Sequence, residues 1–387
     1  MPARPFRRAS RPVGRAVGVF LAASVFLLPS VFVDPLRPDR EERYALAAGV
    51  RLTAVESPTR WLSYRLAEAA VGPGSLVMLG GRLSLTRPLS SWAAGAGPSV
   101  LAAVNGDFFD IDGSGVPLGP VVRDGRLLKG SAEPVKAVGT DDRGRLRKGR
   151  VKLVGTVSVA GVTRPLGCLN CLDPEDGFAV YTPAWGTKAR PAHRAGPLRS
   201  IRVSAGRVTG VRAGADGRPV PADGFLLVAV GSAAREVAGV GPGAAASFTA
   251  GQKPRKRPWA LAMGYRGTLL RNGKIPVFRD TPRYWFREPR TALGWDDSGR
   301  RLWLLVVDGR SLRSAGLTIA ATARLLQSHG VSNAVMLDGG GSAEMLARTS
   351  PRQGLRIVNN PSEGAERPVP NGLAVLTSRS SPHSRER

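Results

Sequence analysis

The sequence predicts an α/β to α+β fold: a mixed β-sheet with a C-terminal βαβ unit and a β-rich N-terminal and middle portion. From residue 49 onward, short apolar runs alternate with Gly- and Pro-rich turns, which is typical of short strands. Near the C-terminus, residues 317–329 have apolar positions at helical spacing between two strand-like runs. The 387 residues include 48 Gly, 31 Pro and 42% hydrophobic residues, which indicates a loop-rich globular protein rather than a disordered one.

The N-terminus carries a targeting or anchoring segment. Five arginines precede the apolar run AVGVFLAASVFLLPSVFV at residues 16–33, namely Arg4, Arg7, Arg8, Arg11 and Arg15. A basic flank before such a run is typical of an export signal or of a single membrane anchor, and the length of the run does not decide between them. We expect residues 1–33 to be a signal peptide or membrane anchor and residues 34–48 a charged linker. The remainder is then extracytoplasmic, either secreted or anchored to the cytoplasmic membrane.

From residue 49 the chain alternates between expected strands and turns. Expected elements are strands over VRLTAV (50–55), SLVMLG (75–80) and RLSLT (82–86), a short helix over SSWAAGAG (90–97) and a strand over VLAAV (100–104). In the middle, the clearest strands are RVKLVGTVSVAGV (150–162) and GFLLVAV (224–230), and Asn272-Gly273 marks a hairpin turn. We expect one domain over residues 49–377, followed by a polar tail at 378–387.

The βαβ unit places two acids together. LWLLVV (302–307) ends at Asp308, the helix 317–329 starts at the N-cap Thr318 and stops at Gly330, and NAVML (333–337) ends at Asp338. If the two strands are parallel, both acids emerge at the same sheet edge, where open α/β sheets bind ligands. The sequence therefore predicts a site at this edge.

The charge restricts the partners. Lys and Arg number 56 against 29 Asp and Glu, a net charge of +27 that attracts nucleic acid, acidic lipid or an anionic wall polymer. A compositional bias toward Arg explains the same excess. The basic residues are scattered and few aromatics lie among them, so we predict no nucleic-acid partner.

Two cysteines, Cys168 and Cys171, form a lone C-x-x-C. Outside the membrane a loop-closing disulfide is favoured over a redox pair, and too few histidines are present for a structural zinc. No cofactor is required, although a calcium or magnesium site at Asp308 and Asp338 is left open because both are hard oxygen ligands. The absence of G-x-S-x-G and G-x-x-x-x-G-K-[ST] motifs weakens serine-hydrolase and nucleotide-hydrolase interpretations.

Eight segments in order resemble the phosphodiester glycosidase family. They are VNGDFF (104–109), PLGPVVRDGRLL (117–128), GTLLRNGK (267–274), PRTALGWD (289–296), LLVVDGR (304–310), GLTIAATARLL (316–326), NAVMLDGGGSAEM (333–345) and ERPVPNGLAVL (366–376). The resemblance runs from about residue 49 to 377 and identifies 49–377 as the glycosidase domain. The chain departs from the family at Asp107, where many members carry Gly, and at Ala321, where Glu is common.

The resemblance implies a hydrolase that splits a sugar-1-phosphodiester between the anomeric carbon and the phosphate oxygen. The products are a free sugar and a phosphomonoester. An extracytoplasmic location makes a glycosyl-phosphate polymer or capped cell-wall glycan the expected substrate. The alternative is a non-catalytic binder of anionic cell-wall polysaccharide, and the sequence leaves the oligomeric state undetermined.

Two carboxyl groups normally manage glycosyl transfer. Asp338 is the expected base or nucleophile, with Asp308 or Glu366 as its catalytic partner. Because the leaving phosphate is acidic, charge stabilisation should matter more than acid assistance. The expected substrate-binding residues are Asn105, Asp107, Arg290, Arg310, Gly339, Gly340, Gly341, Ser342 and Arg367.

Structural roles compete with these assignments. Asp308 and Asp338 each precede glycine and can cap turns instead. Asn105 and Asp107 can hold a strained turn, Arg290 can anchor the sheet, and Glu366 and Arg367 can form a surface pair. Two further residues are weaker candidates: Glu344, which strand alternation would turn away, and His193, the one histidine suited to act as a base.

Overall fold

The computed structural model describes residues 39–172, 176–188, 190, 196–278, 286–350 and 353–377. The predicted signal or anchor (1–33) and polar tail (378–387) lie outside these residues. Among the described residues, no helix has the length and apolar character needed to cross a membrane.

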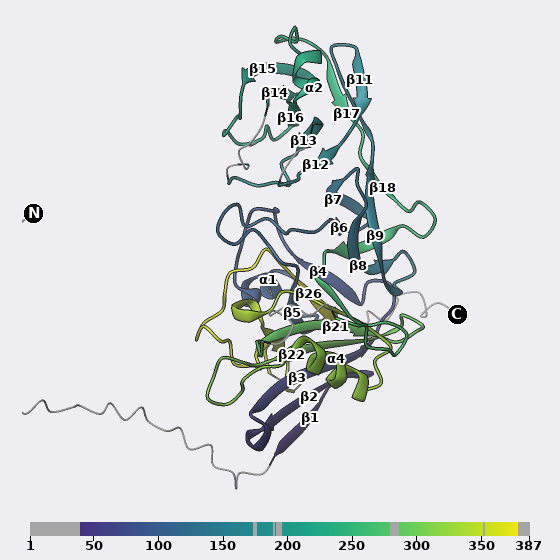
Figure 1. The fold of residues 1–387 in the computed structure, drawn as a ribbon, viewed down its shortest axis with the longest axis vertical. Coiled ribbons are helices and arrows are strands. Elements are labelled where there is room, and N and C mark those ends of the chain that lie inside the picture. The colour runs from purple at the N-terminus through teal and green to yellow at the C-terminus, as the bar shows by residue number, and fades with distance from the viewer. Residues whose placement is uncertain are drawn as a thin grey trace, which may run out of the picture. The chain divides into compact units, whose positions relative to one another are not determined.

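A seven-stranded antiparallel sheet holds the predicted C-terminal motif (Figure 1). In spatial order its strands are β1 (Arg40–Ala47), β2 (Val50–Ser57), β3 (Leu62–Ala70), β22 (Arg301–Val307), β21 (Arg290–Trp295), β23 (Asn333–Met336) and β20 (Gly267–Leu270). Strands β22 and β23 both pair antiparallel with β21, so they run parallel to each other with β21 between them. A short 3₁₀ helix, η1 (Pro58–Arg60), connects β2 to β3.

A five-stranded sheet packs against the seven-stranded one. Its order is β25 (Arg356–Ile357), β24 (Met345–Ala347), β5 (Val100–Asn105), β26 (Asn371–Leu376) and β4 (Leu76–Gly80). Side chains from both sheets share one buried core, including Leu304 and Val335 from the first sheet and Val104 and Leu373 from the second. The two sheets therefore form a sandwich.

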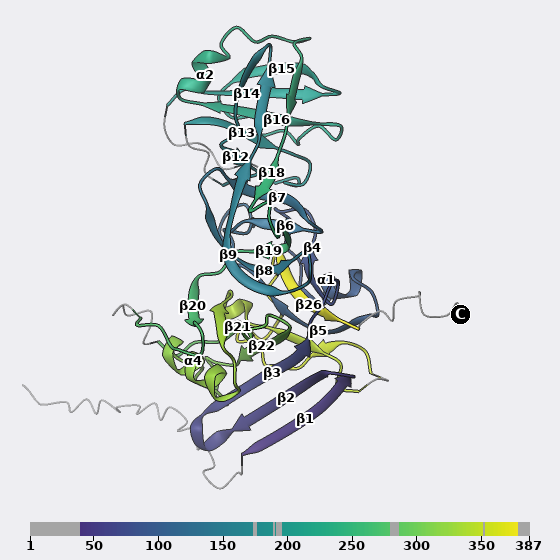
Figure 2. The same ribbon diagram turned by 90° about the vertical axis from the view of Figure 1, so that its right-hand side faces the viewer.

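One helix covers the outer face of each of these two sheets. Helix α4 (Ile319–Ser328) buries Ala323 and Leu326 against the seven-stranded sheet, and α1 (Leu89–Gly95) buries Leu89 and Ala93 against the five-stranded one. Figure 2 shows α4 beside β21 and β22. The hydroxyl of Thr318 accepts from the Ala321 N–H at 3.1 Å, which confirms the predicted N-cap.

The middle of the chain forms the largest sheet. Its eleven strands, in order, are β15 (Arg207–Ala213), β14 (Leu198–Ser204), β16 (Gly224–Val230), β13 (Gly177–Tyr181), β12 (Cys168–Leu169), β7 (Arg126–Ser131), β6 (Val121–Arg123), β19 (Trp259–Met263), β8 (Val135–Asp141), β9 (Leu146–Val154) and β18 (Gly251–Lys253). Strands β12 and β13 are parallel, so this sheet is mixed. A three-stranded sheet of β11 (Val162–Pro165), β10 (Thr156–Val159) and β17 (Ala246–Phe248), together with α2 (Ser232–Glu236), shares a second core with it. The predicted mixed, β-rich fold class is confirmed.

A disulfide joins Cys168 and Cys171, as predicted for this C-x-x-C pair. At the predicted hairpin turn, Asn272 and Gly273 have φ values of 49° and 73°. Positive φ at both central positions is the geometry that favours this dipeptide in tight hairpins.

Two sequence predictions require correction, and one observation qualifies a third that holds. Residues 40–47 belong to strand β1 rather than to a linker; the inward positions Glu42, Tyr44 and Leu46 alternate with exposed ones, and the charges of an edge strand hid that alternation. The segment 82–86 is a turn rather than a strand. The two strands of the βαβ unit are parallel but not adjacent, because β21 pairs between them.

Candidate functional site

Asp338 lies at the end of β23 with its carboxyl group largely buried. The carboxylate accepts hydrogen bonds from the Ser342 hydroxyl and the Gly339 N–H. Burial raises the pKa of Asp338 to about 6, opposed by these hydrogen bonds and by the positive charges of Arg367 and Arg266. An acid with this pKa is ionised near neutrality yet remains basic enough to take a proton or attack a carbon.

Asn105, fully buried at the end of β5, fixes the backbone around this acid. Its amide nitrogen donates to the Asp338 carbonyl at 2.7 Å. Its amide oxygen accepts from the Thr291 hydroxyl at 2.7 Å and from the Glu344 N–H at 3.2 Å. The Asp338 N–H in turn donates to the Gly106 carbonyl at 3.0 Å. Both ends of the side-chain amide are thus occupied by the protein, which favours a positioning role for Asn105.

The glycine loop Gly339–Ser342 forms a single 3₁₀ turn, η2 (Gly340–Ser342). The Gly340 N–H donates to the Pro289 carbonyl at 3.0 Å, and the Ser342 N–H donates to the Gly339 carbonyl at 3.2 Å. The Gly339 N–H donates to the Asp338 carboxylate. Of the four predicted donors in Gly339–Ser342, Gly341 is therefore the one whose N–H has no partner within the described residues.

Arg367 faces this loop. Its Nη1 donates to the Ser342 hydroxyl at 3.2 Å, and its guanidinium is paired with Glu363. Arg310 approaches the loop from another side. Its Nε lies 2.6 Å from a carboxylate oxygen of Glu288, and its Nη2 lies 3.4 Å from the position that a Cβ on Gly340 would occupy. The structure therefore brings two of the three predicted arginines, Arg310 and Arg367, to the glycine loop, each with an acidic partner.

Arg290 does not face the loop in the same way. Its guanidinium is largely buried and donates to the Leu317 carbonyl at 2.9 Å and the Phe286 carbonyl at 2.8 Å. These bonds anchor the start of β21 to the segment before α4. The predicted phosphate clamp is therefore less favoured at Arg290 than a sheet-anchoring role.

Asp308 lies at the same sheet end, as predicted, but its carboxylate is enclosed by donors. One oxygen accepts from the Ser63 hydroxyl at 2.7 Å; the other accepts from the Asn359 amide at 3.1 Å and the Asn360 N–H at 2.8 Å. Burial raises the pKa of Asp308 and these hydrogen bonds lower it. These hydrogen bonds hold the end of β22 against the loop after β25. We therefore infer that Asp308 stabilises the backbone around the site.

Glu366 meets a second carboxyl group, that of Glu344. The Ser90 N–H donates to Glu366 at 2.9 Å, while burial and contact with Glu366 raise the pKa of Glu344 to about 8. Two carboxyl groups in contact cannot both ionise readily, so the pair holds a proton at neutral pH. Glu344 is 3% exposed, so the expected outward orientation from strand alternation is not observed.

Asp107 connects its own loop to the loops that contain Gly119 and Gly264, near Asp338. Its carboxylate accepts from the Gly119 N–H at 2.8 Å and the Gly264 N–H at 3.2 Å. Burial raises the pKa of Asp107 to about 6, and the negative charge of Asp338 contributes in the same direction. The buried ammonium of Lys129, which donates to the Gly119 carbonyl at 3.0 Å, opposes this rise.

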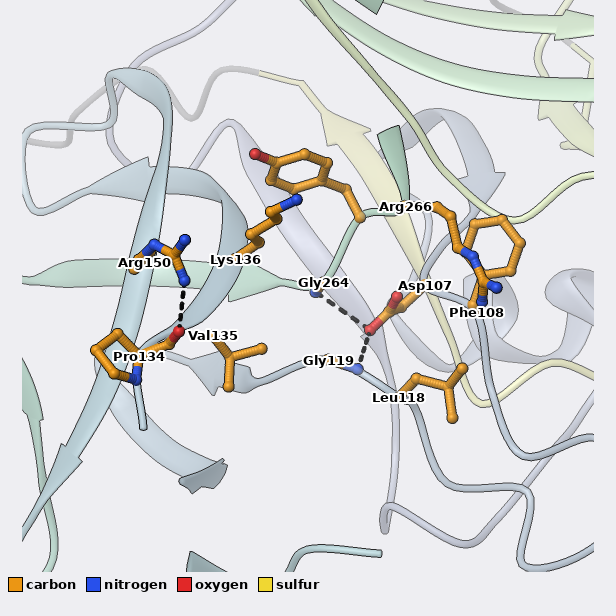
Figure 3. Close-up of a pocket in the computed structure, with 11 residues that line it drawn as sticks. Asp107, Phe108, Leu118, Gly119, Pro134, Val135, Lys136, Arg150, Gly264 and Arg266 are labelled. Carbon is orange, nitrogen blue, oxygen red and sulfur yellow. Dashed lines mark hydrogen bonds between the residues drawn. The ribbon is translucent and has the colours of Figure 1, made fainter. Parts of the chain in front are cut away.

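A pocket of about 360 Å³ opens next to Asp107 (Figure 3). Arg266, Lys136 and Arg150 line it, and the Arg266 guanidinium lies 5.3 Å from the centre of the Phe108 ring. Sequence reasoning missed Arg266, which stands one residue before the GTLLRNGK segment. The sequence signal that could have indicated Arg266 is its position directly before Gly267, the first residue of β20.

In the described part of the chain, no three His, Cys, Asp or Glu side chains gather as metal ligands. The candidate base His193 lies outside the described residues. His329 caps the C-terminal end of α4, and its ring nitrogen lies 3.3 Å from the Tyr64 hydroxyl. The charged groups that the described residues bring together at the site are carboxyl groups and arginines.

Comparisons with known proteins bear on this arrangement. The family model of the phosphodiester glycosidases matches residues 199–376, which include Asp338, the glycine loop and Glu366. This match confirms the resemblance to that family over residues 199–376.

Individual relatives are distant. An uncharacterized SPbeta prophage-derived protein of Bacillus subtilis (strain 168), YomE, is 39% identical over 89 residues, which cover 23% of this chain and 13% of that protein. A hypothetical protein from Synechocystis has a similar fold, with a TM-score of 0.68 and 21% identity over 87% of this chain and 64% of its own. This chain thus spans less than two thirds of either protein.

A zebrafish N-acetylglucosamine-1-phosphodiester alpha-N-acetylglucosaminidase catalytic domain, auto-inhibited by its pro-peptide, also aligns. It has 17% identity, with 89% of this chain and 92% of that chain covered. Its TM-score is 0.44.

Proposed function

We propose that this chain, whose residues 199–376 match the phosphodiester glycosidase family, hydrolyses a sugar-1-phosphodiester at its glycosidic bond. The products are a free sugar and a phosphomonoester. The observation that carries the proposal is a buried acid, Asp338, whose pKa is raised to about 6 beside the positive charges of Arg367 and Arg266.

Asp338 is the reactive carboxylate in this proposal. The oxocarbenium-like transition state develops positive charge at the anomeric carbon, and a nearby carboxylate stabilises it as nucleophile or as the base that activates water. The Ser342 and Gly339 hydrogen bonds orient the Asp338 carboxylate, and Asn105 holds its backbone in place. The carboxylate is thus positioned before substrate binds.

The arginines around Asp338 bind the phosphate. Arg266 has no ion-pair partner within the described residues, and Arg367 donates a hydrogen bond to the Ser342 hydroxyl. As the glycosidic bond breaks, negative charge grows on the departing phosphate, and fixed guanidinium groups stabilise that charge more than they stabilise the bound diester. The leaving group is a weak base, so little protonation is needed for it to depart.

The Glu344–Glu366 pair supplies the second carboxyl site. Because Glu344 keeps its proton to about pH 8, the pair has a proton to share at neutral pH. Asn105 accepts from the Glu344 N–H and donates to the Asp338 carbonyl, so the two acid positions are fixed relative to each other through one amide. This favours Glu366, rather than Asp308, as the partner of Asp338.

The substrate and location belong to the same proposal. The basic flank and apolar run of residues 1–33 favour an extracytoplasmic enzyme, secreted or anchored to the membrane. A net charge of +27 would draw such an enzyme toward anionic polymers of the cell wall. A glycosyl-phosphate polymer or a capped wall glycan would be both extracytoplasmic and anionic, and is therefore the proposed substrate.

The test is a substrate panel. The purified full chain is incubated with alkyl and nucleotide-linked phosphodiesters of several hexoses and N-acetylhexosamines, and free sugar and phosphomonoester are quantified. Stoichiometric release of both products from at least one substrate is the expected result. Retention of anionic wall polysaccharide with no release from any substrate would support the non-catalytic binder instead.

A further inference from the structure

We propose that the pocket beside Asp107 binds a second phosphate of the substrate, so that the preferred substrate carries another phosphate close to the scissile phosphodiester. This inference rests on the proposed function and deepens it. It concerns the class of substrate, which the family match does not specify.

The pocket is built where two sheets meet the loop after β5. Lys136 comes from β8 and Arg150 from β9, both in the eleven-stranded sheet, whereas Arg266 directly precedes β20 of the seven-stranded sheet. Figure 3 shows Lys136 and Arg150 on one side of the pocket and Arg266 with Phe108 on the other. Three cations from separate elements therefore face one volume.

These cations are available to a ligand. Lys136, Arg150 and Arg266 are exposed, and none of them forms a salt bridge within the described residues. Arg150 donates one hydrogen bond, at 2.8 Å, to the Pro134 carbonyl, which orients its guanidinium along the pocket wall. Unpaired guanidinium and ammonium groups that share a pocket favour a multiply charged oxyanion such as phosphate.

The acid in the pocket does not cancel this charge. Asp107 is 4% exposed, and its carboxylate points at the N–H groups of Gly119 and Gly264 (Figure 3). Its negative charge is further balanced by the buried Lys129 ammonium. The open part of the pocket is left positive.

Arg266 links the pocket to the proposed catalytic acid, which does not itself line the pocket. Arg266 lines the pocket, and its charge also acts on the Asp338 carboxyl group. The Arg266 N–H donates to the Met336 carbonyl at 3.1 Å, two residues before that acid. A phosphate in the pocket and a phosphodiester at Asp338 would therefore belong to one substrate molecule.

The volume of about 360 Å³ falls within the range of small-molecule sites and admits a phosphate with its neighbouring carbon skeleton. Two kinds of substrate present this chemistry. One is a polymer whose repeating units are joined by phosphodiesters, and the other is a single sugar phosphodiester with an additional phosphomonoester.

The experiment compares matched substrates. For each sugar that the full chain cleaves, kcat/KM is measured for a diester with a neutral alkyl aglycone, for the same diester with a phosphate on the aglycone, for one with a phosphate on the sugar, and for a short phosphodiester-linked oligomer. At least a tenfold preference for one of the phosphorylated forms is expected, from a contact worth about 1.4 kcal/mol. Equal kcat/KM for all four would overturn the inference while leaving the proposed function intact.

The variant Lys136→Ala/Arg150→Ala should lose most of this preference while keeping kcat/KM on the neutral diester. The control Arg212→Ala/Arg235→Ala removes the same charge from exposed positions in β15 and α2, outside the pocket, and should retain the preference. An equal loss in both variants would mean long-range electrostatics rather than a site. Loss in neither would also overturn the inference.

A binding measurement separates the inference from the proposed function. Titration calorimetry with 1,3-propanediol bisphosphate and with propyl phosphate needs no turnover. The bisphosphate should bind the full chain at least tenfold more tightly, and Lys136→Ala/Arg150→Ala should abolish that difference. If no substrate is cleaved but this difference is found, the proposed function fails and the anion pocket stands; if both ligands bind equally, the pocket assignment is wrong.

Discussion

Replacing Asp308 by alanine should lower the free energy of unfolding by about 2–4 kcal/mol, because one buried and two part-buried donors would lose their common acceptor. The donors are the Ser63 hydroxyl at 2.7 Å, the Asn359 amide at 3.1 Å and the Asn360 N–H at 2.8 Å. Each buried donor without an acceptor costs about 1–3 kcal/mol, and the losses overlap because they share one cavity.

Asp308→Asn is the more discriminating change. An amide keeps the volume and one acceptor oxygen, but its NH2 group then faces a donor, so a loss of about 1–2 kcal/mol is expected. Since Asp308 acts by holding the loop after β25, turnover should fall in proportion to lost structure and recover at lower temperature. The free energy of unfolding is measured by urea titration of the full chain, together with kcat on a cleaved phosphodiester.

Asp112→Asn is the matched control. Asp112 is exposed, and its replacement should change the free energy of unfolding by less than about 0.5 kcal/mol. The reasoning is refuted if Asp308→Asn is as stable as this control yet loses more than about a hundredfold in kcat, since that pattern marks a group that acts in the transition state.

Other residues of the site give further expectations. Asn105→Ala removes three buried hydrogen bonds and should cost about 3 kcal/mol in urea titrations while also lowering kcat; unchanged stability would contradict its positioning role. In Gly341→Ala the new Cβ would stand 2.2 Å from the Arg367 guanidinium, so kcat/KM should fall about tenfold with little loss of stability, whereas Gly354→Ala, with open space around it, should match wild type. Burial and Glu366 raise the pKa of Glu344 to about 8 in the folded state, above the ordinary glutamate value of 4.5, so stability should fall as pH rises between these values; the slope should be shallower in Glu344→Gln, and equal slopes would disprove the carboxyl pair.

The sequence predicts the location of the site better than the roles of its residues. Strand, helix and strand spacing correctly put Asp308 and Asp338 at one end of a sheet. The intervening β21 was not foreseen, because antiparallel pairing by a preceding strand leaves no mark on the periodicity of the βαβ segment. Its insertion leaves both acids at that end, since β22 and β23 stay parallel.

Roles depend on which partner each side chain meets, and that is a property of long-range packing. Arg290 and Arg310 are similar in sequence, each next to a short motif, yet one is bonded to backbone carbonyls and the other to a carboxylate. Glu344 follows the glycine loop at a spacing that strand alternation alone would turn outward. The 3₁₀ turn η2 resets that alternation and points the side chain at Glu366.

The central claim is that the carboxylate of Asp338 performs the chemistry, and free-sugar release by Asp338→Asn tests it most directly. On the best phosphodiester of the panel, the variant should lose about 10³-fold or more in kcat while its thermal unfolding midpoint stays within a few degrees of wild type. A variant that folds normally and keeps most of the wild-type turnover would contradict the account, and Asp338 would then serve only to hold the glycine loop.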